Sequence, residues 1–225
     1  MIPTVPFVLA AAVCFGPESS TTRTHPASLF APHAAVDSTY RSLWESGQTF
    51  ADFVADADSR KEQWEANFAK QAVPDALVSR LTAAVTAGWK LFVVTRSGCS
   101  DSVNSIPYLG SLVARVPTLE MRLIDVNPGM KVLEAHRTPD GRPATPTVIL
   151  LDADFNERGC WIERPAALIS WMADQKGKIS DGALFEGKMK WYDEDRGASS
   201  LEEIVQMVEA AAGGKLRCGN SDSGT

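Results

Sequence analysis

Cysteine and histidine are scarce in this chain, which has four cysteines and three histidines among 225 residues. The cysteines stand at positions 14, 99, 160 and 218, so none of them has the short spacing of a zinc-binding motif. They also lack the dense pattern of a small domain stapled by disulfides. We therefore interpret them as individual thiols and expect no metal.

Basic clusters and glycine-rich phosphate loops are missing as well. With a net charge of −6 and scattered Lys and Arg, the chain does not favour nucleic acid as a partner. Without a phosphate loop, nucleotide enzymes are disfavoured. A Cys-His hydrolase also lacks support, because His136 is the one histidine in the expected domain. Protein or small-molecule partners remain, and the oligomeric state stays open.

The chain has little apolar sequence of membrane-spanning length. The run Pro6–Phe15 is too short to cross a bilayer, and no Lys or Arg precedes it as in a typical signal peptide. We therefore expect a cytoplasmic protein. Export, organelle targeting through residues 1–15 and an over-extended start stay open as alternatives. Residues 1–36 are expected to be a leader or disordered segment, and residues 213–225 a disordered tail.

Helical and strand patterns alternate along the rest of the chain. Helices are predicted at 39–46, from 50 to 68 with Thr49 as the cap, from Pro74 to Gly88, at 100–116 with a kink at Pro107, at 128–136, 165–171 and 201–211. Strands are predicted at 91–94, 119–126, 147–151 and 157–162. The order indicates an α/β domain over 74–212, with a mixed sheet covered by helices on both faces. Residues 37–73 form a helical N-terminal extension.

Cys99 stands where an apolar strand ends and a helix begins. The first N–H groups of a helix have no partners within the helix, and the positive end of the helix dipole lies there. Both stabilise a thiolate over a thiol. Cys99 is therefore the candidate reactive residue, against the alternative of an unreactive small residue.

The order of several motifs resembles bacterial thioredoxin-like proteins of the thioredoxin superfamily. The residues are Gly98-Cys99-Ser100-Asp101-Ser102, then Asn104 and Pro107, Thr145-Pro146-Thr147, and Trp161-Ile-Glu-Arg164-Pro165. The resemblance implies a three-layer thioredoxin-like fold with four to five strands, in which Cys99 caps the active-site helix. It also implies that Pro146 follows a cis peptide bond. The backbone of Thr145 would then be presented to a peptide or thiol substrate.

Three departures from this family pattern limit the chemistry. Ser102 occupies the position of the second cysteine in dithiol thioredoxins, so the site is of the monothiol C-x-x-S type, and a hydroxyl cannot form a disulfide. Val93 stands where the family commonly keeps a buried acid, and Gly98 replaces the usual aromatic residue. An internal dithiol cycle is therefore excluded at this motif. Ser102 is either a hydrogen-bond partner of the thiolate or a residue that only starts the helix.

Three further residues complete the candidate site. Asp101 and Arg164 are expected to contribute to substrate binding, with the alternative that Arg164 only pairs with Glu163. The charge of Asp101 stabilises the helix dipole but opposes a nearby thiolate. Cys160 is a candidate resolving thiol, because its predicted strand pairs with the one after Pro146; the alternative is a small core residue.

The leading hypothesis is a thiol-disulfide oxidoreductase-like protein that forms a mixed disulfide through Cys99. An external thiol such as glutathione would resolve it, and no bound cofactor is expected. The alternative is a non-catalytic peptide-binding or chaperone-like module that keeps the fold without redox turnover.

Overall fold

The computed structural model describes residues 34–70, 73–85 and 88–219. The apolar run Pro6–Phe15 and most of the expected leader lie outside these ranges, although helix α1 already begins at Ala34. Within the described ranges, no helix combines the length and apolar character needed to cross a membrane.

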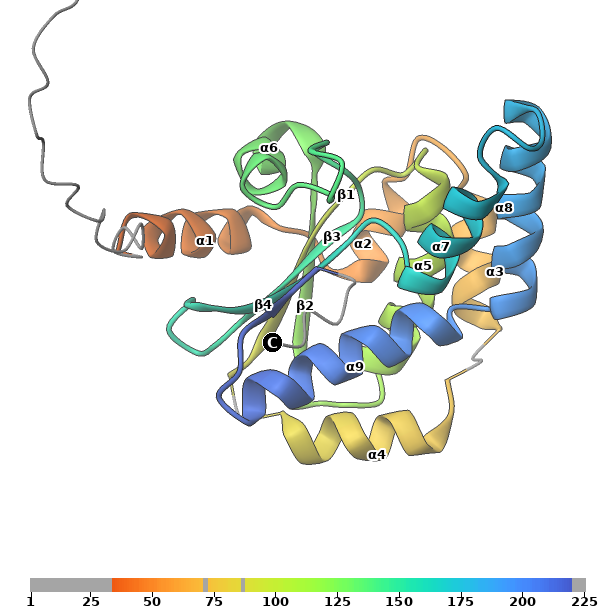
Figure 1. Cartoon of the computed structure of the whole chain (residues 1–225). Coiled ribbons are helices and arrows are strands. Elements are labelled where there is room, and N and C mark those ends of the chain that lie inside the picture. The colour runs from red at the N-terminus through yellow and green to blue at the C-terminus, as the bar shows by residue number, and fades with distance from the viewer. Residues whose placement is uncertain (1–33, 71–72, 86–87, 220–225) are drawn as a thin grey trace, which may run out of the picture. The chain divides into compact units, whose positions relative to one another are not determined.

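The centre of the domain is a mixed five-stranded sheet (Figure 1). Its strands are β1 Lys90–Thr95, β2 Glu120–Asp125, β3 Thr147–Leu151, β4 Glu157–Ile162 and β5 Arg217–Cys218. Their order across the sheet is β2-β1-β3-β4-β5. The pairs β1–β2 and β4–β5 are parallel, whereas β3 is antiparallel to both of its neighbours. This confirms the expected thioredoxin-like α/β fold.

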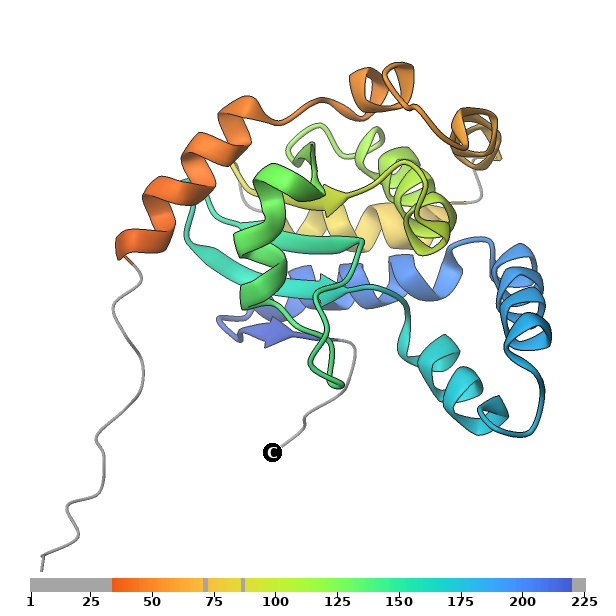
Figure 2. The same ribbon diagram turned by 90° about the horizontal axis from the view of Figure 1, so that it is seen from above.

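Helices cover both faces of the sheet (Figures 1 and 2). One face is covered by α1 Ala34–Ser46 and α6 Val126–Ala135. The other face carries α5 Ser100–Val113 and α9 Ala198–Ala212, with α4 Asp75–Ala84 packed against α9. Helices α2 Phe50–Ala55 and α3 Lys61–Ala69 precede β1 in the chain, while α7 Ala166–Gln175 and α8 Asp181–Asp195 follow β4 and precede α9.

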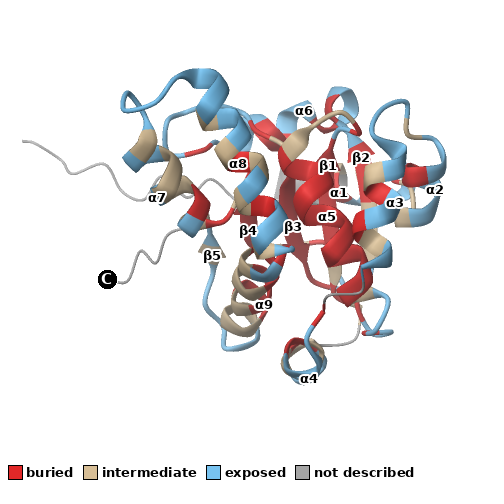
Figure 3. Cartoon of the chain, turned by 90° about the vertical axis from the view of Figure 1, so that its right-hand side faces the viewer, coloured by how far each residue is buried: buried red, intermediate tan, exposed pale blue. Residues whose placement is uncertain are grey.

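Alternating side chains of the central strands fill two separate cores. In β1, Leu91 and Val93 face α5, whereas Phe92 and Val94 face α1 and α6. All four of these side chains are fully buried, because helices cover the strand on both sides. Helix α5 is buried over almost its whole length (Figure 3). The end of the sheet and the start of α5 are thus held by packing on all sides.

Helix α5 runs through Pro107 without interruption. Proline has no N–H, so the carbonyl of Val103, four residues earlier, loses its helical partner. Asn67 of α3 supplies the missing donor, with its Nδ2 at 2.7 Å from the Val103 oxygen. The N-terminal helices therefore complete the hydrogen bonding of the helix that begins after Cys99.

Several predicted elements differ from the structure. The helix expected over 50–68 is two helices, because the chain turns at 56–60 and brings Asp58 to the hydroxyl of Ser97. Helix α8 was not predicted. The expected disordered tail is wrong for its first part, since Arg217–Cys218 form β5 beside β4. Residues 220–225 lie outside the described part of the chain.

Candidate functional site

The Cys99 thiol lies at the first turn of α5, facing the loop that precedes β3. Cys99 is the N-cap residue of α5 and is partly exposed. Its Sγ donates to the backbone carbonyl of Thr145, at 3.2 Å. The Thr145-Pro146 peptide bond is cis, as the resemblance implied. The fold thus brings together the two motifs that are most distinctive in the sequence.

Ser102 lies in the first turn of α5, and its hydroxyl makes no hydrogen bond to the sulfur of Cys99. Its side chain is fully buried, and its Oγ has no hydrogen-bond partner in the described part of the chain. The interpretation of Ser102 as a hydrogen-bond partner of the thiolate is therefore not realised in this structure. Its hydroxyl occupies a buried position on the helix without a donor or acceptor role.

Asp101 is the centre of a buried charge cluster at the start of α5. Its carboxylate accepts from Tyr192 at 2.8 Å, from Lys188 Nζ at 3.2 Å to each oxygen, and from Arg164 at 3.1 Å. Lys188 also donates to Ser100 Oγ at 2.9 Å. Two cations therefore compensate the carboxylate next to Cys99, which removes the electrostatic objection to a thiolate there.

Arg164 and Asp101, the two expected substrate-binding residues, are joined in an ion pair. Their side chains are 13% and 8% exposed, so most of their charged surface is turned to the protein. Arg164 also pairs with Glu163, which in turn pairs with Arg142 at 3.2 Å. Burial, followed by the negative charge and hydrogen bond of Asp101, raises the pKa of Tyr192. Tyr192 is therefore a neutral donor to this cluster.

The N-terminal helices hold the loop before Cys99 from the other side. Trp64 is fully buried and its Nε1 donates to the carbonyl of Ser97 at 3.0 Å. The hydroxyl of Ser97 donates to Asp58. Gly98 lies beside Ser59, and a Cβ at Gly98 would make ordinary van der Waals contact with the hydroxyl oxygen of Ser59, at 3.5 Å. The loop, the thiol and the helix start are thus fixed between α3 and α8.

A family model described as thioredoxin matches residues 47–176, which is more than half of the chain. The chain belongs to the thioredoxin family. The match begins before α2, so it includes α2 and α3 as well as the sheet up to β4. A search of the curated proteins found no match.

Two solved structures share the fold of this thioredoxin-family chain. One is a protein of unknown function from Pseudomonas aeruginosa, 23% identical, with a TM-score of 0.59. The other is an HIV epitope scaffold, 20% identical, with a TM-score of 0.59. In both cases the alignment covers 76% of this chain and 98% of the other. At these identities the likeness concerns the fold alone.

Lys188 and Tyr192 are site residues that the sequence did not reveal. Both belong to α8, whose pattern of apolar residues is too weak to predict a helix. Two local signals were present. Ser180 accepts from the backbone of Ala183 as an N-cap, and Lys188 and Tyr192 are four residues apart and so share one helix face.

The interpretation of the cysteines as individual thiols is wrong for two of them in this thioredoxin-family chain. Cys160 of β4 forms a disulfide with Cys218 of β5. Cys160 is also part of the core beneath α1 and α6, whereas α5 packs on the opposite face of the sheet. Cys160 is therefore not the resolving thiol that was considered, because its sulfur is bonded and faces away from α5.

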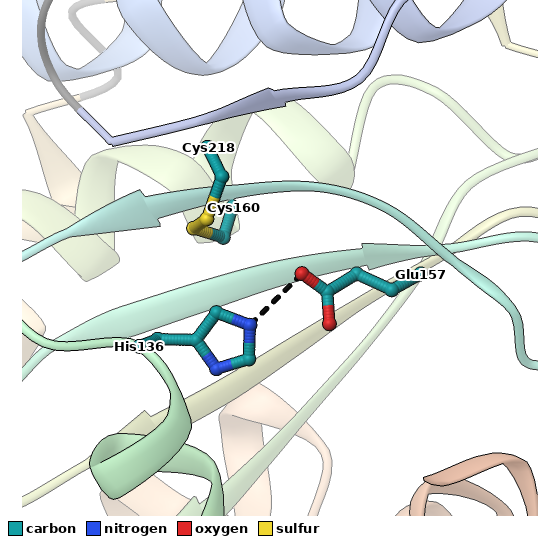
Figure 4. A group of neighbouring side chains, drawn as sticks. All are labelled: His136, Glu157, Cys160 and Cys218. Carbon is teal, nitrogen blue, oxygen red and sulfur yellow. Dashed lines mark hydrogen bonds and ion pairs between the residues drawn. A yellow bond between two sulfur atoms is a disulfide. The ribbon is translucent and has the colours of Figure 1, made fainter. Parts of the chain in front are cut away.

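His136 and Glu157 lie beside this disulfide (Figure 4). His136 Nε2 is 2.8 Å from a carboxylate oxygen of Glu157, and its Nδ1 donates to the Val132 carbonyl at 2.8 Å. Burial lowers the pKa of His136, but the hydrogen bond and charge of Glu157 and the Val132 carbonyl outweigh it, so the pKa is raised. His136 therefore links the end of α6 to Glu157 at the start of β4.

The large cavity of the domain, about 1460 Å³ in volume, opens on this side and not at Cys99. Its lining includes His136, Arg164 and Cys218. Cys99 is not among its lining residues. The Cys99 thiol is instead partly exposed at the start of α5, outside this cavity.

Proposed function

We propose that this protein forms a mixed disulfide with protein or small-molecule disulfides through Cys99, and that an external thiol such as glutathione releases it. The observation that carries the proposal is the partly exposed Cys99 thiol at the start of α5, 3.2 Å from the carbonyl before cis-Pro146. The thiolate attacks one sulfur of the substrate disulfide, forms the mixed disulfide and expels the other sulfur as a thiolate. A glutathione thiolate then attacks the substrate sulfur and releases Cys99.

The surroundings of Cys99 support a single thiol that depends on an outside partner. Ser102 offers no sulfur, and Cys160 is bonded to Cys218 on the other side of the sheet. In the described part of the chain, no other free thiol accompanies Cys99. The mixed disulfide would therefore persist until an external thiol arrives.

Intact-mass spectrometry after incubation with glutathione disulfide tests the proposal. The Cys14→Ser variant, kept free of reductant so that Cys160–Cys218 stays closed, should gain one glutathione per chain. Cys14→Ser/Cys99→Ser should gain none. Iodoacetamide should alkylate Cys99 faster than free cysteine at neutral pH, because the helix start stabilises the thiolate. An adduct of equal yield in the Cys14→Ser/Cys99→Ser variant refutes the proposal.

Ser102→Cys tests whether the scaffold itself supports redox turnover. A thiol at this position should form a disulfide with Cys99 and should reduce a protein disulfide with dithiothreitol as the electron donor. Wild type should reduce the protein disulfide when glutathione is the electron donor. Its activity should be lower with substrates whose mixed disulfide with Cys99 is long-lived. If Ser102→Cys gains nothing in either assay, the redox assignment of Cys99 fails.

The second candidate function is a peptide-binding module without redox turnover, and the buried, unpartnered Ser102 hydroxyl favours it. Such a module would use the backbone around Thr145, which is partly exposed beside Cys99. A peptide that binds wild type and Cys99→Ser with equal affinity, in the absence of any mixed disulfide, decides for this second function.

A further inference from the structure

Four metal-ligating side chains meet at the edge of the sheet opposite β2 (Figure 4). Cys160 and Cys218 lie in register on the parallel strands β4 and β5, with their Cα atoms 4.3 Å apart. Glu157 begins β4, and His136 follows the last turn of α6. One ligand atom from each of the four residues lies within 4.8 Å of the others.

We propose that reduction of the Cys160–Cys218 disulfide opens a binding site for Zn²⁺ or a similar divalent transition metal. Two thiolates, one imidazole nitrogen and one carboxylate are a donor set that zinc accepts, and four protein ligands give the closed tetrahedral arrangement of a structural site. The proposal does not depend on the function of Cys99, which lies at the start of α5 beyond the other face of the sheet.

The histidine and the glutamate already have the outer contacts that metal ligands need. His136 Nδ1 donates to the Val132 carbonyl at 2.8 Å, which leaves Nε2 as the nitrogen directed to the cluster. Tyr40 donates to the second carboxylate oxygen of Glu157 at 2.8 Å. Such outer hydrogen bonds fix the tautomer and orientation of metal-bound His and carboxylate groups. The cluster therefore has four donors, and hydrogen bonds to Val132 and Tyr40 already orient two of them.

The adjustment needed to admit a metal is small. Sulfur atoms bound to the same tetrahedral zinc at about 2.3 Å are about 3.8 Å apart, so the two sulfurs must separate. The hydrogen bond of 2.8 Å between His136 Nε2 and Glu157 must also open, so that both atoms face the metal within a group that now spans 4.8 Å. Cys218 is exposed, and together with His136 it lines the large cavity. Both the reductant and the metal thus have access from solvent.

The redox step balances with an external dithiol or phosphine as the reductant. A dithiol gives two electrons and two protons to the Cys160–Cys218 bond, which becomes two thiols while the reductant becomes a cyclic disulfide. The metal then displaces the two thiol protons and the proton that His136 Nε2 shares with Glu157, and it binds the two thiolates, the imidazole nitrogen and the carboxylate. In the oxidised protein neither sulfur is a thiolate, so the metal loses its two strongest donors.

Cobalt(II) is the spectroscopic probe, and the full chain carrying Cys14→Ser and Cys99→Ser is the protein, so that thiolate signals arise from Cys160 and Cys218 only. After reduction by a phosphine, we expect one Co²⁺ per chain with thiolate-to-cobalt charge-transfer bands and the visible bands of tetrahedral cobalt. Zn²⁺ should displace the cobalt and protect both thiols from alkylation. The oxidised protein should show none of these bands.

Two variants in the same background test the non-sulfur ligands. His136→Gln and Glu157→Gln keep both thiols and should each weaken cobalt binding at least about tenfold. Glu120→Gln, at an exposed position of β2, is the matched control and should bind as the parent does. If His136→Gln and Glu157→Gln bind as tightly as the control, the four-ligand assignment is overturned.

Two further results would also overturn the proposal. One is a reduced protein without thiolate-to-cobalt bands, and the other is equal cobalt binding by the oxidised form. Far-ultraviolet circular dichroism covers the case in which reduction itself unfolds the chain. Recovery of helical signal on addition of Zn²⁺ then supports the site, and its absence contradicts it.

Discussion

The charge cluster around Asp101 gives a quantitative test of how α8 holds the helix that starts after Cys99. The perturbation is Lys188→Met, which keeps an unbranched side chain one heavy atom shorter than lysine and removes the ammonium group. The Lys188 and Asp101 side chains are both only 8% exposed, so the loss of one partner leaves a buried charge less compensated. Such losses cost about 3 to 5 kcal/mol in proteins.

The structure places this case at the lower end of the range. Asp101 keeps Tyr192 at 2.8 Å and Arg164 at 3.1 Å when Lys188 is replaced. We therefore expect a loss of about 3 kcal/mol in the free energy of unfolding. With a urea dependence of about 2.5 kcal/mol/M, the midpoint of unfolding should fall by about 1 M. Tryptophan fluorescence reports the transition, since buried Trp64 and Trp161 lie in the same core.

Two comparisons make the result decisive. Lys190→Met on the same helix removes a pair at 3.8 Å whose lysine is 78% exposed, and it should cost less than about 0.5 kcal/mol. The double variant Asp101→Asn/Lys188→Met should be more stable than the sum of the single losses predicts, by about 2 kcal/mol. Equal losses for Lys188→Met and Lys190→Met, or additivity within about 0.5 kcal/mol, would refute the reasoning.

Three other substitutions probe the packing around the site by urea unfolding. Asn67→Leu should lower the free energy of unfolding by about 1 to 3 kcal/mol, because the Val103 carbonyl loses its donor. The loss should be smaller in a Pro107→Ala background, where residue 107 regains an N–H. An unchanged loss in that background contradicts this explanation. Gly187→Ala should cost about 1 to 3 kcal/mol, because its Cβ would lie 2.5 Å from the Trp171 ring; unaltered stability would show that α7 and α8 separate freely. Arg80→Ala should lower the free energy of unfolding by less than about 1 kcal/mol despite two ion pairs, because the Arg80 side chain is 36% exposed. A larger loss would contradict the expectation that exposed ion pairs between α4 and α9 contribute little to stability.

The elements that the sequence predicted best are those with a strong local signal. The central strands β1 and β3 are continuous apolar runs, because both of their faces are covered. Thr49, Pro74 and Pro165 mark helix starts, and each is the N-cap residue in the structure. Helix α8 was missed because its contacts to the core are few, with Lys188 and Tyr192 as its buried residues.

The candidate site also has some features that the sequence predicted and others that only the structure revealed. The sequence predicted that Cys99 lies at the strand-helix junction. The family resemblance predicted that Cys99 lies beside the loop of Thr145 and cis-Pro146. The partners of Asp101 could not be predicted, since Lys188 and Tyr192 are 87 and 91 residues away in the chain. Nor could the metal-ligating cluster, whose members come from α6, β4 and β5 and have no characteristic spacing.

By itself, the sequence determined the alternation of strands and helices, the place of Cys99 at a helix start and the absence of a second thiol at Ser102, since each depends on residues that are near neighbours in the chain. The tertiary structure alone decided which charges compensate Asp101 and which cysteines pair. Those contacts depend on the register of β5 against β4 and on the packing of α8 against α5. These contacts form because folding buries charged groups and cysteines from distant segments next to one another, and local sequence propensity does not specify such neighbours.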